Sequence, residues 1–271
     1  MNGASREALA AARERLDALT DNTSVDATKL ADELAAVTAL LDREVSLRRV
    51  LTDPAQAGEA KAELAQRLLG GQVGGEATDL LAGMVRSRWS QSRDLVDALE
   101  ELADTADLTA AQKAGTLDDV EDELFRFGRI VSSSTELRAA LTDRAATTSA
   151  KSELLRSLLG GRAKATTERL VTRLVTAPRG RSLESGLESL SKLAAERRDR
   201  MVAVVTSAVP LSDRQKQRLG AALAKLYGRT MHLNLDVDPE VVGGIRVQVG
   251  DELINGSLAD RIEDAGRRLA S

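Results

Sequence analysis

Four glycines lie in the stretch VVGGIRVQVGDELINGSL, residues 241–258, and two kinds of chemistry use such a density of glycine. A phosphate-binding loop places glycines between a strand and a helix N-terminus, where backbone N–H groups face the anion. A tight hairpin uses glycine because its turn needs positive φ. Gly243-Gly244 runs into the alternating segment IRVQV rather than into a helix, and Gly250-Asp251 suits a two-residue turn. The stretch therefore predicts a hairpin.

The last glycine of this stretch does precede a predicted helix, but its neighbours disfavour phosphate. Ser257 and Asp260 form a capping box after Gly256, and the carboxylate of Asp260 would repel an anion. Gly243 and Gly244 are better explained by a bulge or by a close approach of two backbones. No nucleotide or other cofactor site is predicted.

Metal and nucleophile chemistry find equally little support. His232 alternates with Asn234 and Asp236, yet it is the one histidine of the chain, and there is no cysteine. Zinc sites, disulfides and thiolate chemistry all need more of these residues. A single histidine among many serines also indicates no catalytic triad. We predict no catalytic residue, no metal and no enzyme activity.

The residues around the hairpin predict a small C-terminal α/β domain. MVAVVTSAV from residue 201 is typical of a buried strand, and Pro210 follows it. Ser212 and Gln215 form a capping box for a helix that stops at Gly228. TMHLNLDV then alternates as a strand covered on one face. With the hairpin and the closing helix, this makes a short sheet and two helices.

The chain upstream has helical period and contains a duplication. Apolar residues recur three and four apart, and Gly or Pro breaks the pattern at short intervals, as in antiparallel bundles. LTDPAQAGEAKAELAQRLLGG, residues 51–71, and LTDRAATTSAKSELLRSLLGG, residues 141–161, are identical at 12 of 21 positions at an offset of 90. We therefore predict an α+β, mostly α fold with two tandem antiparallel helical bundles before the α/β domain.

The predicted domains are an N-terminal helical bundle at residues 1–105, a second, duplicated bundle at residues 106–200 and the C-terminal α/β domain at residues 201–271. The Ala, Asp and Thr stretch around Gly115 has two interpretations. It could be a hinge between the bundles, or the end of one helix, a tight loop and the start of the next.

Composition restricts the partners and the location. The formal net charge is −4, so there is no basic field for nucleic acid. The first thirty residues carry charges where a secretory signal would be apolar, and no run of about eighteen apolar residues exists. We predict a cytoplasmic chain that does not insert into the membrane.

The C-terminal string GGIRVQVGDELINGSLADRI resembles the signature of the delta subunit of F-type ATP synthase, the family of the oligomycin sensitivity-conferring protein. The opening segment REALAAARERLDAL is similar to that family's usual start, although the common tyrosine is absent. Ordinary members have one bundle, so the extra ninety residues resemble the longer actinobacterial form. The signature residues here are Gly243, Gly244, Arg246, Gly250, Asp251, Ile254, Gly256 and Ser257.

The resemblance implies a non-catalytic stator subunit of the peripheral stalk. Such a subunit links the catalytic alpha/beta head to the b stalk, so that rotation is coupled to ATP synthesis. The implied partners are the N-terminal helices of the alpha subunits and the C-terminus of the b subunit, and the implied place is the cytoplasmic face of the cell membrane. The alternative is a generic helical scaffold or adaptor unrelated to ATP synthase.

One aromatic residue is a candidate for an interface. Trp89 lies near Arg86, Arg88 and Arg93 at a predicted helix junction, and tryptophan is common among interface anchors. The competing interpretation is that Trp89 fills the core of its own bundle.

Overall fold

A computed structural model describes residues 1–21, 24–199, 201–227, 231–238, 241, 244–249 and 252–255. The chain separates into two compact units, residues 1–197 and residues 198–271. Gly243, Gly250, Asp251 and the segment from residue 256 onward, with the predicted closing helix, lie outside the described residues.

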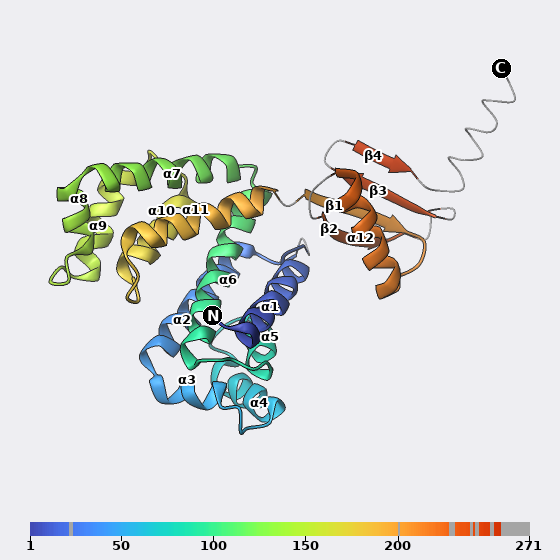
Figure 1. Ribbon diagram of the computed structural model, residues 1–271, viewed down its shortest axis with the longest axis horizontal. Helices are drawn as coiled ribbons and strands as arrows, with labels where there is room; N and C mark the ends of the chain where they lie inside the picture. The colour runs from blue at the N-terminus through green and yellow to red at the C-terminus, as the bar shows by residue number, and fades with distance from the viewer. Residues whose placement is uncertain are drawn as a thin grey trace, which may run out of the picture. The chain divides into compact units, whose positions relative to one another are not determined.

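The first unit is helical throughout its regular structure (Figure 1). Its helices are α1 (Gly3–Asp21), α2 (Ala27–Arg43), α3 (Val45–Thr52), α4 (Gly58–Leu69), α5 (Gly75–Arg86), α6 (Ser92–Lys113), α7 (Leu117–Ser133), α8 (Thr135–Thr142), α9 (Thr148–Leu159), α10 (Ala165–Thr176) and α11 (Leu183–Asp199).

The duplication is exact in the helix boundaries. Helices α2, α3, α4 and α5 begin and end 90 residues before α7, α8, α9 and α10 respectively. The same offset carries α1, residues 3–21, onto residues 93–111, which lie within α6. Helix α6 is therefore the last helix of the first copy and the first helix of the second.

Two apolar cores reflect this sharing. Leu99, Leu102 and Ala106 of α6 lie in the first core, whereas Leu108 and Ala111 of the same helix lie in the second. Figure 1 shows α6 leading from the first bundle into the second. The predicted boundary at residue 105 falls inside this helix.

The segment around Gly115 is a helix end and a short turn. Helix α6 runs to Lys113, and α7 begins at Leu117 after a turn in which Gly115 has a φ of 68°. Only glycine adopts that conformation without steric cost. The amide of Thr116 closes the turn by donating to the carbonyl of Ala111 at 2.9 Å.

The second unit contains a four-stranded sheet and α12 (Asp213–Tyr227). The strands are β1 (Met201–Ser207), β2 (Met231–Val237), β3 (Ile245–Val249) and β4 (Glu252–Asn255), in the order β2-β1-β3-β4. β1 pairs parallel to β2 across the α12 connection and antiparallel to β3. Buried Leu223 of α12 packs with Ala203, Val205, Val247 and Val249 of the sheet.

The predicted fold class and several of the predicted elements are confirmed. The chain is mostly α with a small C-terminal sheet. β3 and β4 form the predicted hairpin, with Val249 opposite Glu252 across a two-residue link. The side chain of Gln215 accepts hydrogen bonds from the Ser212 amide at 2.8 Å and the Ser212 hydroxyl at 2.7 Å, at the predicted start of α12.

The cap of α2 provides a test of the first bundle. Asp26 precedes α2, and its carboxylate accepts hydrogen bonds from the amides of Thr28 and Lys29 at 2.9 and 3.1 Å. We expect Asp26→Ala to lower the free energy of unfolding by about 1 kcal/mol, because these helix amides lose their acceptor. Urea unfolding followed by circular dichroism measures the change. Asp79→Ala, at an exposed position of α5, is the matched control and should change stability by less than about 0.5 kcal/mol.

Candidate functional site: an ionic junction and an apolar groove

Arginines of the second copy bind carboxylates of α6 and its neighbours. Arg173 of α10 donates to Asp104 at 2.5 Å and to Asp107 at 2.6 Å. Arg169, one turn earlier, donates to Asp107 at 2.9 Å and to Asp32 of α2 at 2.6 Å. Asp107 is 1% exposed, so its bonds to Arg169 and Arg173 are charge-assisted bonds to a buried carboxylate, whereas Asp32 is exposed.

Two arginines that follow α10 in the chain also bind carboxylates of the first copy and of α6. Arg181, in the loop between α10 and α11, donates to Glu100 at 2.6 Å. Arg197 of α11 donates to Asp17 of α1 at 2.6 Å and to the side chain of Gln112 at 2.7 Å. We call this set of pairs the ionic junction. It consists of Arg169, Arg173, Arg179, Arg181 and Arg197 with Asp17, Asp32, Glu100, Asp104 and Asp107.

Arg179 completes the ionic junction in a strained conformation. Its φ is 47°, a left-handed value that a non-glycine residue adopts at a cost. Its guanidinium lies 3.0 Å from Glu100 and 3.7 Å from Asp42, and its carbonyl accepts a hydrogen bond from Arg93 at 2.7 Å. The side chain is only 6% exposed, so contacts with the first copy hold this backbone in place.

At the ionic junction, the carboxyl of Asp104 has a raised pKa. Its pKa is raised from 3.8 to about 7. Burial is the largest cause, the neighbouring Glu100 and Asp107 also raise the pKa, and Arg173 acts in the opposite direction. Burial also lowers the pKa of Arg173, but Asp104 and Asp107 more than offset this, so the net pKa of Arg173 is raised. Arg173 therefore stays charged whether or not Asp104 carries a proton.

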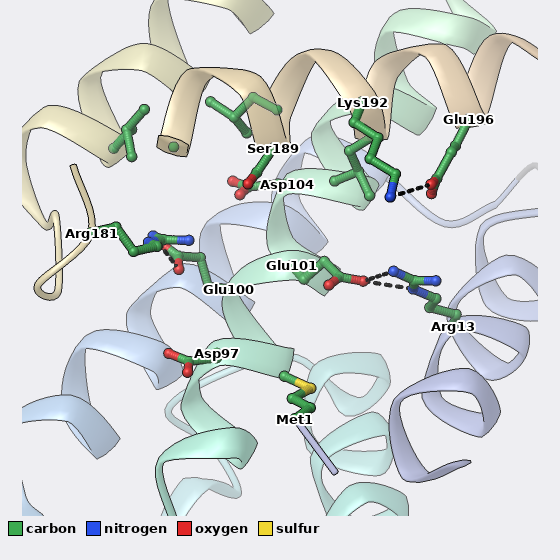
Figure 2. A pocket seen from close by; sticks show the side chains of 14 residues that line it. Met1, Arg13, Asp97, Glu100, Glu101, Asp104, Arg181, Ser189, Lys192 and Glu196 are labelled. Atoms are coloured by element: carbon green, nitrogen blue, oxygen red, sulfur yellow. Dashed lines mark hydrogen bonds and ion pairs between the residues drawn. The ribbon is translucent and has the colours of Figure 1, made fainter. Parts of the chain in front are cut away.

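A cavity of about 340 Å³ lies beside the ionic junction (Figure 2). Carboxylates of α6 line it, including Asp97, Glu100 and Asp104, and Lys192 and Glu196 pair with each other on its α11 side. Across the cavity, Arg13 of α1 pairs with Glu101. The described residues contain no group of three side chains suited to holding a metal ion.

A larger and more apolar groove lies between α7 and α11. Its volume is about 960 Å³, and we call it the α7/α11 groove. Leu124 and Leu187 form part of its lining, and Phe125 and Ile130 are 56% and 53% exposed. Residues that line it are Leu124, Phe125, Arg126, Gly128, Arg129, Ile130, Ser132, Ser133, Glu184, Leu187, Glu188 and Ser191. Large exposed apolar side chains in one groove are typical of a protein-docking surface.

The first copy differs at the equivalent positions. Ala35 and Leu40 of α2 correspond to Phe125 and Ile130, and both pack, partly buried, against the first core. The sequence analysis missed the α7/α11 groove, although DELFRFGRI carries the signal. Phe125 and Ile130 fall out of phase with the buried stripe of α7.

Trp89 belongs to the interior of the first bundle. It is 7% exposed, lies in the first core, and donates from Nε1 to the carbonyl of Met84 at 2.8 Å. It also forms part of the lining of a cavity beside Pro54. In the free chain the indole is held by its own bundle, and an interface role for it stays a prediction.

Three of the predicted signature residues are described in the sheet unit, and one of them, Ile254, lies on β4 opposite Val247 of β3. Gly244 has a φ of 90°, which requires glycine and agrees with a special backbone conformation at this point. Arg246 lies on β3 opposite Thr206 of β1 and Asn255 of β4. Their roles, and those of the signature residues outside the described part, stay predictions.

The fold and these surfaces define a helical scaffold with an exposed apolar groove, followed by a small α/β unit. In the described part of the chain, every helix is too short or too polar to cross a membrane.

Comparison with known proteins identifies the scaffold. Residues 105–269 match the family model described as ATP synthase delta (OSCP) subunit. The ATP synthase subunit delta of Streptomyces coelicolor is 87% identical over 271 residues, covering 100% of this chain and 99% of that protein. The Thermobifida fusca subunit of the same name is 48% identical and covers both chains fully. The chain belongs to the ATP synthase delta (OSCP) subunit family.

Membership confirms the stator prediction and excludes the alternative of a scaffold unrelated to ATP synthase. The chain is a peripheral-stalk component of ATP synthase, a non-catalytic subunit of a membrane-associated enzyme complex. It has the long form, since relatives of the same full length contain both copies. A chain of the Toxoplasma gondii mitochondrial ATP synthase hexamer aligns with 62% of this chain and 95% of its own length at 21% identity, but its TM-score of 0.28 supports no argument.

The family match begins in the middle of α6. It includes the second copy and the sheet unit, and the first 104 residues, with REALAAARERLDAL, lie before it. The second copy is therefore the one that corresponds to the family's ordinary bundle.

Removing one arginine tests the ionic junction. We expect Arg173→Met to lower the free energy of unfolding of the helical unit by about 3 kcal/mol, because Asp104 and Asp107 lose a buried partner. Urea unfolding measures the effect. Arg156→Met, at an exposed position of α9, is the matched control. Equal stability of the two variants would show that the ionic junction contributes nothing to folding.

Asp104→Asn tests the raised pKa. The unfolded chain releases this proton near pH 3.8, whereas the folded chain keeps it until about pH 7. The stabilisation from the retained proton is full below the lower value and is lost as the pH rises through the higher one. The stability of the unsubstituted chain relative to the variant should therefore fall across this range, by at most roughly 1.4 kcal/mol per unit of pKa difference. Parallel stability curves over the range would contradict the assignment.

Proposed function

We propose that the α7/α11 groove binds the N-terminal helix of an alpha subunit, and that the sheet unit holds the C-terminus of the b stalk. The chain would then connect the head to the stalk at the cytoplasmic face of the cell membrane. The observation that carries the first part is the pair of half-exposed side chains, Phe125 and Ile130, in a groove between two helices.

The dimensions of the α7/α11 groove suit an amphipathic helix. Its lining along α7 runs from Leu124 to Ser133, which is about 14 Å of helix at about 1.5 Å per residue. A guest helix could place apolar side chains on Phe125 and Ile130, as in other helix-in-groove complexes.

The charges on the two rims favour one orientation of the guest. Arg129 lies on the α7 side, and Glu188 lies on the α11 side. A helix with acidic residues along one edge and basic residues along the other would complement both rims. Such complementarity contributes more to orientation and association rate than to affinity.

The second copy is favoured over the first as the docking bundle for two reasons. It is the copy that the family model matches. In the first copy, moreover, the equivalents of Phe125 and Ile130 pack against the core.

The sheet unit also carries exposed apolar side chains. Val204 of β1 is 37% exposed, and Val209, in the loop after β1, is 66% exposed. Leu226 of α12 is 67% exposed. They support a second docking surface on this unit, and the b stalk is the partner that the resemblance implies. Two attachments on one chain raise the effective concentration of each for its own partner.

Phe125→Glu tests the α7/α11 groove. We expect the variant to bind a synthetic peptide of the alpha N-terminal segment at least tenfold more weakly, because a charge replaces the apolar contact at the centre of the groove. Isothermal titration calorimetry on the full chain measures the dissociation constant. Leu68→Glu is the matched control, since Leu68 is a 46% exposed apolar residue of α4, outside the groove. Unchanged binding by Phe125→Glu, or an equal loss in both variants, would exclude the groove as the site.

A further inference from the structure

A second cavity of the helical unit carries an unusual combination of charge and apolar surface. It has a volume of about 580 Å³ and is formed by α8, α9, α10 and the loop that leads to α11. Leu141, Leu174, Val175 and Leu183 are at most 5% exposed and form apolar parts of its wall. We call it the basic cavity. Its volume lies within the range of about 300 to 1,000 Å³ that small-molecule pockets occupy.

The polar part of the wall is predominantly cationic. Arg138, Arg144, Lys151 and Arg181 line the basic cavity, and Glu184 is its one acidic lining residue. Two of the cations are already paired, Arg138 with Glu184 at 3.2 Å and Arg181 with Glu100 at 2.6 Å.

The other two cations are available to a ligand. In the part of the chain that the structure describes, the side chains of Arg144 and Lys151 have neither an ion pair nor a hydrogen bond. The carboxylate of Glu184 is already hydrogen-bonded, because its own backbone amide and the side chain of Arg138 donate to it and lower its pKa. The cavity thus offers positive charge next to a buried apolar wall.

The first copy has a cavity of about 420 Å³ at the equivalent place, where Pro54 and Gln91 stand at the positions of Arg144 and Arg181. At the position equivalent to Arg179 it has Trp89, an indole buried in the first core. Arg179 instead extends to Glu100 in the ionic junction, so the second copy has no large apolar side chain at this position. The exposure of the lysine at the equivalent position also differs between the copies. Lys61 of the first copy is buried, whereas Lys151 of the second copy is partly exposed.

We propose that the basic cavity binds an organic anion, an apolar body with one carboxylate or phosphate group. The anionic group would lie between Arg144 and Lys151, and the apolar body would contact Leu141, Val175 and Leu183. This site goes beyond the stator function and does not depend on the α7/α11 groove, whose lining shares only Glu184 with it.

Methyl NMR of the full chain, titrated with 2-naphthoate, tests the proposal. We expect saturable shifts of the Leu141, Val175 and Leu183 methyls, with a dissociation constant below about 1 mM. Leu51 and Val85 occupy the positions equivalent to Leu141 and Val175 in the first copy, and their methyls should not move. Absence of saturation by both 2-naphthoate and 2-naphthyl phosphate, or equal shifts in both copies, would overturn the site.

Ligand variants separate the two parts of the recognition. The uncharged 2-naphthamide should bind at least tenfold more weakly than 2-naphthoate, and inorganic phosphate should bind more weakly because it has no apolar body. 2-Naphthyl phosphate compares the two anionic groups, and at least one of the two naphthyl anions must bind. Equal affinity for the amide, or for inorganic phosphate, would overturn the proposed ligand class.

Substitution of the two unpaired cations tests whether they bind the anionic group of the ligand. The double variant Arg144→Gln, Lys151→Gln should weaken 2-naphthoate binding at least tenfold. The matched control is Arg156→Gln, Arg162→Gln, which removes the same charge from exposed positions outside the cavity. Equal affinity of the two double variants would overturn the proposal.

Discussion

The arrangement of the helical unit depends on the buried ion pairs that join its two copies through α6. A helix that belongs to two cores already restricts how the copies move, because its backbone hydrogen bonds run without interruption from one core to the other. The arginines of α10 and α11 add a second constraint from the side. Burying such charges is costly, but breaking one pair leaves an uncompensated charge and costs more. The ionic junction thus opposes bending between the copies.

This constraint also assigns different surfaces to the two copies. The faces of α6 and α10 that meet at the ionic junction are occupied by each other, whereas the α7/α11 groove is lined by other residues and keeps Phe125 and Ile130 exposed. The equivalents of Arg169 and Arg173 in the first copy are Asp79 and Gly83, which cannot form the same pairs. A peripheral stalk must transmit torque without yielding, and a two-bundle unit whose copies are joined by buried ion pairs suits that requirement.

Sequence reasoning recovered the features that depend on local pattern. The duplication predicted the 90-residue offset that the helix boundaries follow, and the alternation around Gly250 predicted the hairpin. The sequence did not reveal that the two copies share α6. At the offset of 90, α1 and α6 have in common little more than scattered apolar positions and the pair Asp17 and Asp107. The ionic junction was missed for a different reason. Arginines and aspartates spaced along amphipathic helices indicate a solvated face unless the fold is known. The α7/α11 groove, by contrast, could have been found from Phe125 and Ile130, which interrupt the polar face of a predicted helix.

The exchange of Trp89 for Arg179 connects three of these features. In the first copy the indole fills space that its own bundle provides and satisfies its N–H on Met84. An arginine at the equivalent position of the second copy cannot be buried in an apolar core without a counter-charge. It turns instead to Glu100, and the left-handed φ of Arg179 is the backbone cost of reaching that partner. A single difference between two otherwise similar copies therefore accounts for a buried indole in the first copy and for an intramolecular ion pair in the second.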